Sequence, residues 1–232
     1  MKTVGIDARL ISQTGVGTYL KNLFYFLDQN PPQDLRFFVY LRQEDYHKIH
    51  FSSSQFIKKQ ANYQWHSLSE QLIFPLQLWL DRLDLMHFTY FSLPLFYPRR
   101  FITTMHDLIP WLYNKTGKAS TRPDFIYKIK HFFYRWVIRN EIWRAQMIIT
   151  PTQAVKNDIV RIFGKPAGKK TVVAYEGVSQ LLKDSSVDQR SLLQLKPGYF
   201  LYVGNFYPHK NVELLVKVFS RLPEARLVLV GP

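Results

Sequence analysis

The amino-acid sequence predicts an α/β protein in which helices flank a mostly parallel sheet, followed by the start of a second unit of the same kind. Three observations support this prediction. Short apolar runs of strand length alternate with longer stretches of helical periodicity, as in β-α-β units. A turn with two glycines, Gly15 and Gly17, separates the first strand from the first helix. The alternation begins again after a polar stretch at residues 180–197.

The elements of the first unit follow from the period of the apolar residues. Alternating or continuous apolar sequence predicts the strands, which are residues 3–8, 36–41, 84–88, 102–105, 147–149 and 171–174. Apolar residues spaced by three and four predict the helices, which are residues 16–27, 69–80 with a restart at Pro75, 124–144, and 153–163 with Thr152 as cap. Residues 45–62 are polar and are predicted to form a surface helix or loop, and residues 111–123 a loop.

The last part of the chain predicts one further β-α-β unit. Its elements are a strand at residues 199–203, a helix at 211–221 and a strand at 226–230. One such unit cannot bury both faces of its sheet, so we expect a second domain that is cut short or is completed from outside this sequence. The predicted domains are therefore residues 1–179 and 198–232, joined by a linker at 180–197.

Composition limits the class of protein. The chain has 232 residues and 47% hydrophobic content, which is enough for a sizeable core. It contains no cysteine, which excludes disulfides and cysteine-based zinc sites or nucleophiles. The start of the chain reads as a strand rather than a signal peptide, and no apolar run reaches the roughly 18 residues of a membrane span. A soluble or peripheral protein of the cytoplasm is expected.

The charge of the chain is strongly positive. Thirty-one Lys and Arg residues against 17 Asp and Glu residues give a net charge of +14. Such a charge favours anionic partners: nucleic acid, acidic lipid headgroups or phosphorylated small molecules. No nucleic-acid-binding motif is present and the basic residues are spread along the chain, so no nucleic-acid partner is predicted.

His106 and Asp107 are the candidate catalytic residues. They come where the strand at residues 102–105 ends. Ligands of parallel α/β sheets bind beyond the carboxyl ends of the strands, where a His-Asp pair can bind hydroxyls or exchange protons. The alternative is that both residues only cap a turn.

The glycine turn at Gly15 and Gly17 is a candidate phosphate-binding site. A strand, a glycine turn and a helix N-terminus bring free N–H groups and the positive end of the helix dipole toward a ligand. Leu20 stands where the dinucleotide fingerprint needs a third glycine, so a plain tight turn is the alternative. Two α/β domains would enclose a cleft, with Asn205 and Lys210 on the wall opposite this turn.

A basic face with interleaved aromatic residues is the candidate membrane or acceptor contact. The helix at residues 124–144 is expected to face inward with Phe125, Ile129, Phe132, Trp136 and Trp143. Its basic side includes Arg135 and Arg139, and the apolar segment at residues 91–98 leads to Arg99 and Arg100. Apolar insertion paired with headgroup attraction is typical of membrane surfaces, and a merely solvated face is the alternative.

Several stretches occur in the order seen in one enzyme family. They are Ile6-Asp7-Ala8-Arg9 with residues 14–23, Glu70-Gln71-Leu72, His106-Asp107-Leu108, residues 150–159, Tyr175-Glu176-Gly177-Val178 and residues 202–211. Together they resemble the family 4 glycosyltransferases with the GT-B fold of two Rossmann-like domains. The resemblance covers essentially the whole chain. It points to the mannosyl- and rhamnosyl-type transferases that carry the His-Asp-Leu element.

The resemblance implies a retaining transfer of a sugar from a nucleotide-sugar to a glycan or lipid-linked acceptor in surface polysaccharide synthesis. No catalytic metal and no cofactor besides the nucleotide-sugar co-substrate are implied. Lys210 matches the family's lysine that meets the charge of the leaving diphosphate, and Asn205 stands where the family often has an arginine. Gly15 and Gly17 match the loop near the diphosphate. His106 matches the histidine near the donor sugar, with Asp107 orienting it or facing the acceptor.

The family's Glu-x7-Glu element, which holds the donor, would fall beyond residue 232. The chain is therefore expected to be the acceptor-side domain plus the start of the donor domain. The alternative function is a non-catalytic fragment that binds the acceptor or the inner face of the membrane.

Overall fold

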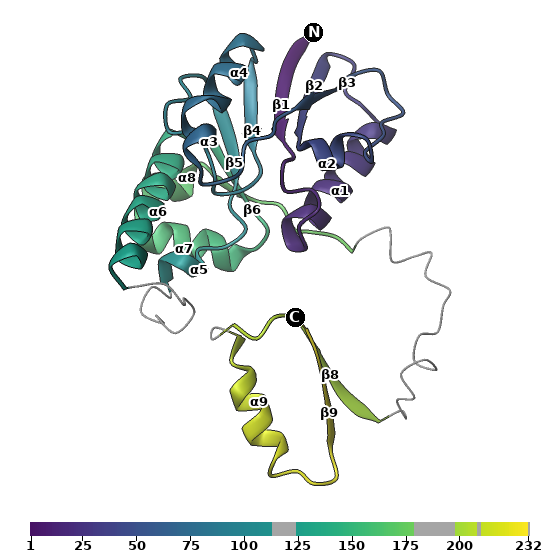
Figure 1. Ribbon diagram of the computed structural model, residues 1–232, viewed down its shortest axis with the longest axis vertical. Helices are drawn as coiled ribbons and strands as arrows, with labels where there is room; N and C mark the ends of the chain where they lie inside the picture. The colour runs from purple at the N-terminus through teal and green to yellow at the C-terminus, as the bar shows by residue number, and fades with distance from the viewer. Residues whose placement is uncertain (113–123, 179–197, 208–209, 232) are drawn as a thin grey trace. The chain divides into compact units, whose positions relative to one another are not determined.

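The computed structural model describes residues 1–112, 124–178, 198–207 and 210–231, with side chains left out at Pro110 and 124–130. The chain divides into two compact units (Figure 1). The first unit is Met1–Leu108 with Phe132–Lys183, and the second is Ile109–His131 with Asp184–Pro232. The predicted linker at 180–197 lies outside the described residues, and the predicted domain boundaries stay a prediction.

A seven-stranded sheet forms the centre of the first unit. Its strands are β1 (Lys2–Asp7), β2 (Leu35–Leu41), β3 (Phe56–Gln60), β4 (Leu85–Phe88), β5 (Phe101–Thr104), β6 (Met147–Thr150) and β7 (Thr171–Val173). All neighbouring pairs are parallel and the order is β3-β2-β1-β4-β5-β6-β7. The strand order reverses between β1 and β4, so the sheet is Rossmann-like. The predicted fold class is confirmed.

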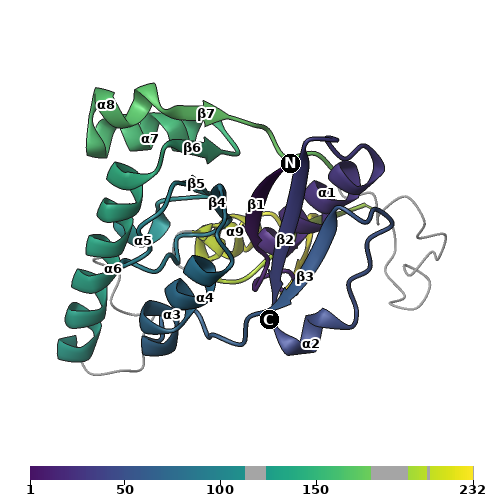
Figure 2. The ribbon, with the colours of Figure 1, turned by 90° about the horizontal axis from the view of Figure 1, so that it is seen from above.

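Helices cover the two faces of the sheet. In the first unit they are α1 (Gly15–Gln29), α2 (Gln43–Tyr46), α3 (Leu68–Leu72), α4 (Phe74–Leu80), α7 (Gln153–Phe163), α8 (Lys165–Lys169) and, from Phe132 on, α6 (Asp124–Arg144). The short helix α5 (Ile109–Leu112) and the start of α6 belong to the second unit. Seen from above, α1 lies on one side of the sheet and α3 and α4 lie on the other (Figure 2). Leu20 and Phe24 of α1 join Ile6 and Val39 of the strands in one apolar core. Pro75 sits in the first turn of α4, which explains the restart after α3.

The prediction for residues 45–62 was wrong, because this segment contains the edge strand β3 besides the end of the short helix α2. Its polar residues hid the strand pattern. The Lys58 ammonium donates to the carbonyl oxygens of Tyr46 (2.6 Å) and Ile49 (2.9 Å). The Lys59 ammonium pairs with the Asp81 carboxylate at 2.7 Å. Two lysines can thus stand in consecutive positions of a strand because each finds its own polar partner beside the sheet.

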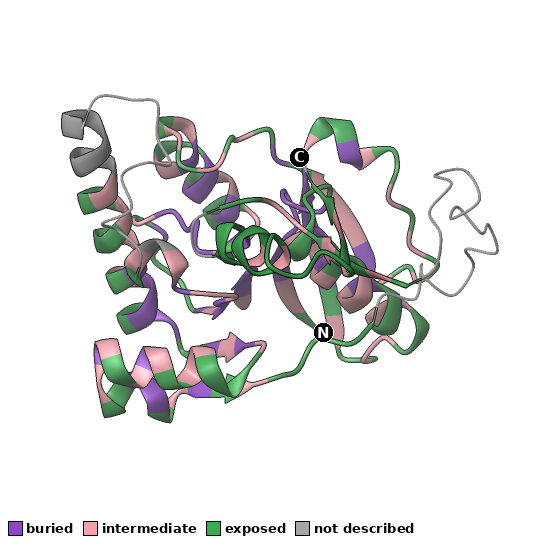
Figure 3. Ribbon diagram, turned by 90° about the horizontal axis from the view of Figure 1, so that it is seen from below, coloured by how far each residue is buried: buried purple, intermediate pink, exposed green. Residues whose placement is uncertain are grey.

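The prediction of the inward face of α6 was also wrong. Its exposed side carries Phe132 (68% exposed), Trp136 and Trp143, whereas Ile138, Glu141 and Ile142 are fully buried. Figure 3 shows buried and exposed residues alternating along the described part of α6. Phe125 and Ile129 lie outside the described side chains. The aromatic residues outnumber the aliphatic ones in this helix, so apolar periodicity alone selects the wrong face.

The second unit contains β8 (Tyr199–Val203), α9 (Val212–Phe219) and β9 (Arg226–Val230). The two strands pair in parallel, with Tyr199 opposite Arg226. The predicted β-α-β unit is confirmed as local structure. Among the apolar side chains described in this unit, only Val212 is buried. A single β-α-β unit therefore leaves most of its apolar surface uncovered, as its size requires.

Candidate active site

The carboxyl ends of β1 and β4 meet where the strand order of the sheet reverses. Asp7 ends β1, and Thr89 directly follows β4. The Thr89 hydroxyl donates to the Asp7 carbonyl oxygen at 2.6 Å, which joins the two strand ends. Such a reversal opens a crevice between the loops that leave the two strands, and ligands of parallel α/β sheets bind there.

His106 lies at this point, one residue after the buried Met105 that follows β5. Its Nδ1 lies 3.0 Å from Oε1 of Glu176, and its Nε2 lies 3.0 Å from the carbonyl oxygen of Thr89. A carboxylate and a carbonyl can only accept hydrogen bonds, so both contacts are made together when both ring nitrogens carry a proton. The two contacts hold the imidazole ring in one orientation between Glu176 and Thr89.

A chain of hydrogen-bonding side chains lies beside His106, and it runs from Tyr19 through Thr104 to His87. The Tyr19 ring meets the His106 ring edge-on, with centroids 5.1 Å apart. The Tyr19 and Thr104 hydroxyls are 3.1 Å apart, and Nε2 of His87 lies 2.8 Å from the Thr104 hydroxyl. Burial lowers the pKa of His87 to about 4, so this ring is neutral near neutral pH. Burial also raises the pKa of Tyr19, which keeps its hydroxyl protonated.

A buried ionic cluster fixes the neighbouring loops to the end of β1. The Arg9 guanidinium is 3% exposed and contacts the carboxylates of Asp7 (2.6 Å) and Glu70 (2.8 Å). Glu70 also accepts from the Ser92 hydroxyl at 2.7 Å and from the His66 backbone N–H at 2.7 Å. Burial disfavours the charged guanidinium, but the two carboxylates more than offset this and raise the pKa of Arg9. The cluster holds α3 and the segment after β4 beside the crevice.

A narrow recess opens next to this cluster. Its lining consists of Asp7, Arg9, Leu10, Trp65, Thr89, Tyr90 and Ser92. The recess measures about 10 Å³, which is room for about one water molecule, and the Asp7 carboxylate at its wall is already paired with Arg9. Burial, followed by the charge of Asp107, raises the pKa of Tyr90, so Asp107 acts on this side of the crevice. The ring nitrogens of His106 contact Glu176 and Thr89.

The two glycines of the predicted phosphate turn differ in their surroundings. A Cβ on Gly17 would lie 2.3 Å from the carbonyl oxygen of Ile11, so this position admits no side chain. A Cβ on Gly15 would meet nothing within 4 Å, and Gly15 is exposed at the first position of α1. Thr14 makes no side-chain cap hydrogen bond to this helix end. Packing therefore explains Gly17, whereas Gly15 leaves open space above the N-terminus of α1.

Asn205 and Lys210 lie in the second unit. Asn205 follows β8, and the Tyr202 hydroxyl donates to its carbonyl oxygen at 2.7 Å. Its Oδ1 is buried without a hydrogen-bond partner among the described residues. Lys210 is exposed just before α9, and its backbone N–H donates to Tyr207 at 2.8 Å.

The four predicted contact arginines, Arg99, Arg100, Arg135 and Arg139, are all exposed. The apolar segment before Arg99 is not free as the sequence suggested, because Phe91, Leu93 and Tyr97 are buried and only Phe96 is strongly exposed. In the part of the chain that the structure describes, no three His, Asp or Glu side chains are placed to hold a metal ion. No described helix combines the length and apolar character needed to cross a bilayer.

The most informative contacts of this site were missed by the sequence prediction. Glu176 and His106 are 70 positions apart, and Arg9 and Glu70 are 61 apart. The stretches that contain Asp7, Arg9, Glu70 and Glu176 carried the family resemblance, but no role was assigned to these residues. The presence of all four residues in these stretches was the one signal in the sequence that could have marked them as site residues.

These features define a Rossmann-like α/β protein with a cluster of polar side chains at the carboxyl ends of its parallel strands. Residues 14–179 match the model of Glycosyltransferase Family 4, and the chain belongs to this family. The chain is 26% identical over 122 residues to the O-antigen chain mannosyltransferase RfbU of Salmonella typhimurium, which covers 51% of this chain and 32% of that protein. It is 24% identical over 154 residues to the O-antigen chain mannosyltransferase B of Escherichia coli, covering 63% and 38%.

The chain thus aligns with about a third of the length of these curated relatives. Among solved structures, the UDP-N-acetylglucosamine 2-epimerase of Rickettsia bellii is similar with a TM-score of 0.52 and 11% identity. The similarity covers 100% of this chain and 62% of that one. At this identity the likeness supports the fold alone.

Proposed function

We propose that the protein containing this chain is a retaining glycosyltransferase of surface polysaccharide synthesis. It transfers a sugar from a nucleotide-sugar donor to a hydroxyl of a glycan or lipid-linked acceptor. Membership of the family and the similarity to two O-antigen chain mannosyltransferases support the reaction class. The observation that carries the proposal is His106, held between Glu176 and Thr89 at the strand-order reversal.

The reaction breaks the bond between the anomeric carbon and the diphosphate oxygen, and the electron pair stays on that oxygen. The acceptor oxygen bonds the anomeric carbon on the same face, and its proton passes to the departing diphosphate oxygen. The developing phosphate charge needs a cation, and we assign this role to Lys210 with Asn205 beside it. For Gly15 and Gly17 we propose diphosphate binding through the backbone N–H groups at the open N-terminus of α1.

His106 is proposed to contact the donor sugar, either through a sugar hydroxyl or by stabilising positive charge with its main chain. Glu176 holds the imidazole in place, since it accepts from Nδ1. Asp107 is proposed to face the acceptor side, because its charge acts on Tyr90 of the recess and on Tyr134.

The test uses the full-length protein and measures release of nucleotide from a panel of nucleotide-sugars with acceptor present. His106→Ala and Lys210→Ala are each expected to lower kcat by about 100-fold or more. His47→Ala and Lys217→Ala are matched controls, since both side chains are exposed on other elements. Unchanged turnover of the two site variants, with folding intact by circular dichroism, would reject the assigned roles.

We also propose that the protein works as a peripheral protein at the anionic inner face of the membrane. The net charge of +14 and the exposure of the four contact arginines support this location. Neutralising Arg99, Arg100, Arg135 and Arg139 together is expected to abolish sedimentation with anionic vesicles. A non-catalytic acceptor- or membrane-binding role is the second candidate. It is favoured if vesicle binding persists in a full-length protein that shows no transfer to any donor.

A further inference from the structure

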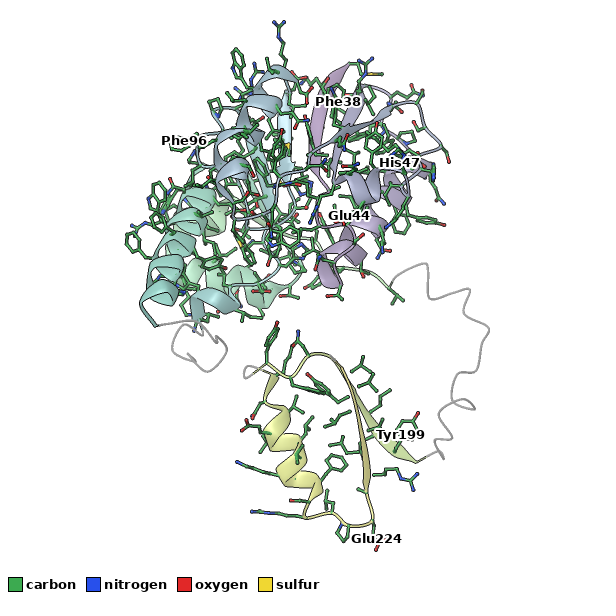
Figure 4. The ribbon with its side chains drawn as sticks, in the orientation of Figure 1. Phe38, Glu44, His47, Phe96, Tyr199 and Glu224 are labelled. Atoms are coloured by element: carbon green, nitrogen blue, oxygen red, sulfur yellow. The ribbon has the colours of Figure 1, made fainter. Side chains whose placement is uncertain are left out.

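The helices α3 and α4 present an apolar surface to solvent. We define the α3–α4 face as six side chains, each more than half exposed: Leu72, Ile73, Leu76, Trp79, Leu80 and Phe96. All six lie in the first unit. Figure 4 labels Phe96, which points away from the sheet at the outer side of this unit. Soluble monomers rarely expose several large apolar side chains in one patch, so we expect this face to bind a partner or a surface.

The sequence of α4 explains why this surface exists. Its other side buries Phe74, Pro75 and Leu78 against the domain. A helix that is apolar on all sides is normally buried on all sides. Here Leu76, Trp79 and Leu80 remain uncovered by the described part of the chain. The exposed side of α4 is therefore apolar, whereas the exposed side of an ordinary amphipathic helix is polar.

Four of the six exposed side chains, Leu72, Leu76, Trp79 and Phe96, line one groove. It measures about 440 Å³ and is lined by Gln71, Leu72, Pro75, Leu76, Trp79, Phe96 and Pro98. Gln71 joins the two segments, because its Nε2 donates to the Leu93 carbonyl (3.2 Å) and its Oε1 accepts from the Leu95 N–H (2.9 Å). Phe96 is thereby held beside α3, so the groove is a fixed feature of the fold.

Positive charge borders this groove. Arg82 follows α4, Arg99 and Arg100 follow Pro98, and all three are exposed. The Arg99 guanidinium donates to the Leu83 carbonyl at 3.3 Å, which ties the two basic positions to one edge of the face. Neighbouring carboxylates already have partners. Asp81 accepts from Tyr40 (2.7 Å) and Lys59 (2.7 Å), Asp84 accepts from the Thr3 N–H (2.7 Å), and Glu70 is buried in the Arg9 cluster.

We propose that the α3–α4 face inserts into the surface of an anionic bilayer, with Trp79 and Phe96 at the headgroup boundary and Arg82, Arg99 and Arg100 on lipid phosphates. Apolar insertion together with basic residues at the rim is the chemistry of interfacial membrane binding. A second copy of this chain fits poorly, because it would bring two bodies of charge +14 together at their arginine rims. The proposal deepens the membrane location given above and does not depend on sugar transfer.

The first test is co-sedimentation of the chain with phosphatidylcholine vesicles, with and without phosphatidylglycerol. We expect binding to the anionic vesicles. Each arginine near an anionic surface contributes about fivefold, so the triple variant R82Q/R99Q/R100Q should bind roughly 100-fold more weakly. The matched control R36Q/R161Q/R221Q removes the same charge from exposed arginines elsewhere and should lose much less. Equal losses in both variants would overturn the assignment of this face.

The apolar part of the face is tested by L76S/W79S/F96S against Y25S/F26S, which changes exposed aromatic residues of α1. The first variant should lose at least tenfold in vesicle binding and the second should not. Transfer to a water-soluble acceptor by the full-length protein should be unchanged in L76S/W79S/F96S. That readout separates failure of the docking proposal from failure of the proposed reaction.

The depth of Trp79 in the bilayer is measured by the quenching of tryptophan fluorescence by brominated lipids. Quenching is expected in the wild-type chain and should fall in Trp79→Phe while binding is retained. Absence of any binding to anionic vesicles would overturn the proposal. So would loss of self-association, rather than of vesicle binding, in L76S/W79S/F96S when measured by analytical ultracentrifugation.

Discussion

Glu141→Gln is expected to make the stability of the folded chain less sensitive to rising pH between about pH 5 and pH 8. Glu141 is fully buried in α6, where the Thr103 hydroxyl bonds its Oε1. Burial, with a smaller contribution from the charge of Glu70, raises the pKa of Glu141 from its ordinary value of 4.5 to about 8, and the Thr103 bond opposes this rise. The group is thus a neutral acid at neutral pH in the folded chain and a carboxylate in the unfolded chain.

The sign of the pH dependence follows from proton binding. Between about pH 4.5 and 8 the folded state keeps a proton on Glu141 that the unfolded state has released, so stability falls as pH rises. The cost reaches about 3 kcal/mol at pH 7 and about 4 kcal/mol at pH 8. His87 acts in the opposite direction, because its lowered pKa of about 4 makes stability rise with pH up to about 6.5. Comparing the variant with the wild type removes the contribution of His87.

The assay is urea unfolding of both proteins over a series of pH values, followed by tryptophan fluorescence. Four tryptophans, Trp65, Trp79, Trp136 and Trp143, report on the first unit. The free energy of unfolding of Glu141→Gln, relative to wild type, should increase by about 3 kcal/mol between about pH 5 and pH 8. Glu44→Gln removes an exposed carboxylate and is the control. A constant difference between Glu141→Gln and wild type across this range would refute the reasoning.

Three further outcomes are expected. Arg9→Met leaves two buried carboxylates without their cation and should destabilise the chain by about 3–5 kcal/mol in urea unfolding; a loss below about 1 kcal/mol would contradict the cluster's role. Thr104→Val leaves Tyr19 without its hydroxyl partner and should cost about 1–3 kcal/mol, checked by the same assay against wild type. Gly17→Ala should lower the thermal midpoint strongly because its Cβ collides with backbone, whereas Gly15→Ala should leave the midpoint unchanged and raise the KM for the donor in the full-length protein; equal midpoints for both variants would contradict the packing argument.

Local periodicity was sufficient for most of the fold. β1 and α1 have clean apolar patterns, so their positions follow from the sequence alone. The edge strand β3 was not predicted, because Lys58 and Lys59 interrupt the apolar alternation that marks a strand. The face of α6 was misassigned because exposed Trp136 belongs to a residue class that is usually buried.

The sequence could predict a residue of the candidate site only where that residue directly follows a recognisable strand or turn. His106 was selected as a candidate because it follows a recognisable strand. Its partner Glu176 was not assigned a role, since hydrogen bonds between residues 70 positions apart leave no periodic trace in one sequence. The same holds for Arg9 and Glu70, which pair only once β1 and α3 are packed together. Folding brings these polar groups together, and burial then makes each dependent on the others.

The lysines of β3 also bear on how the chain behaves in concentrated solution. An outer strand offers unpaired N–H and C=O groups to any strand of another molecule. At β3 an incoming strand would meet two cations already engaged, Lys58 with the turn after α2 and Lys59 with Asp81. The opposite border, β7, is only three residues long. Both borders of the sheet therefore oppose its growth into a ribbon shared between molecules, which protects the chain against strand-mediated aggregation.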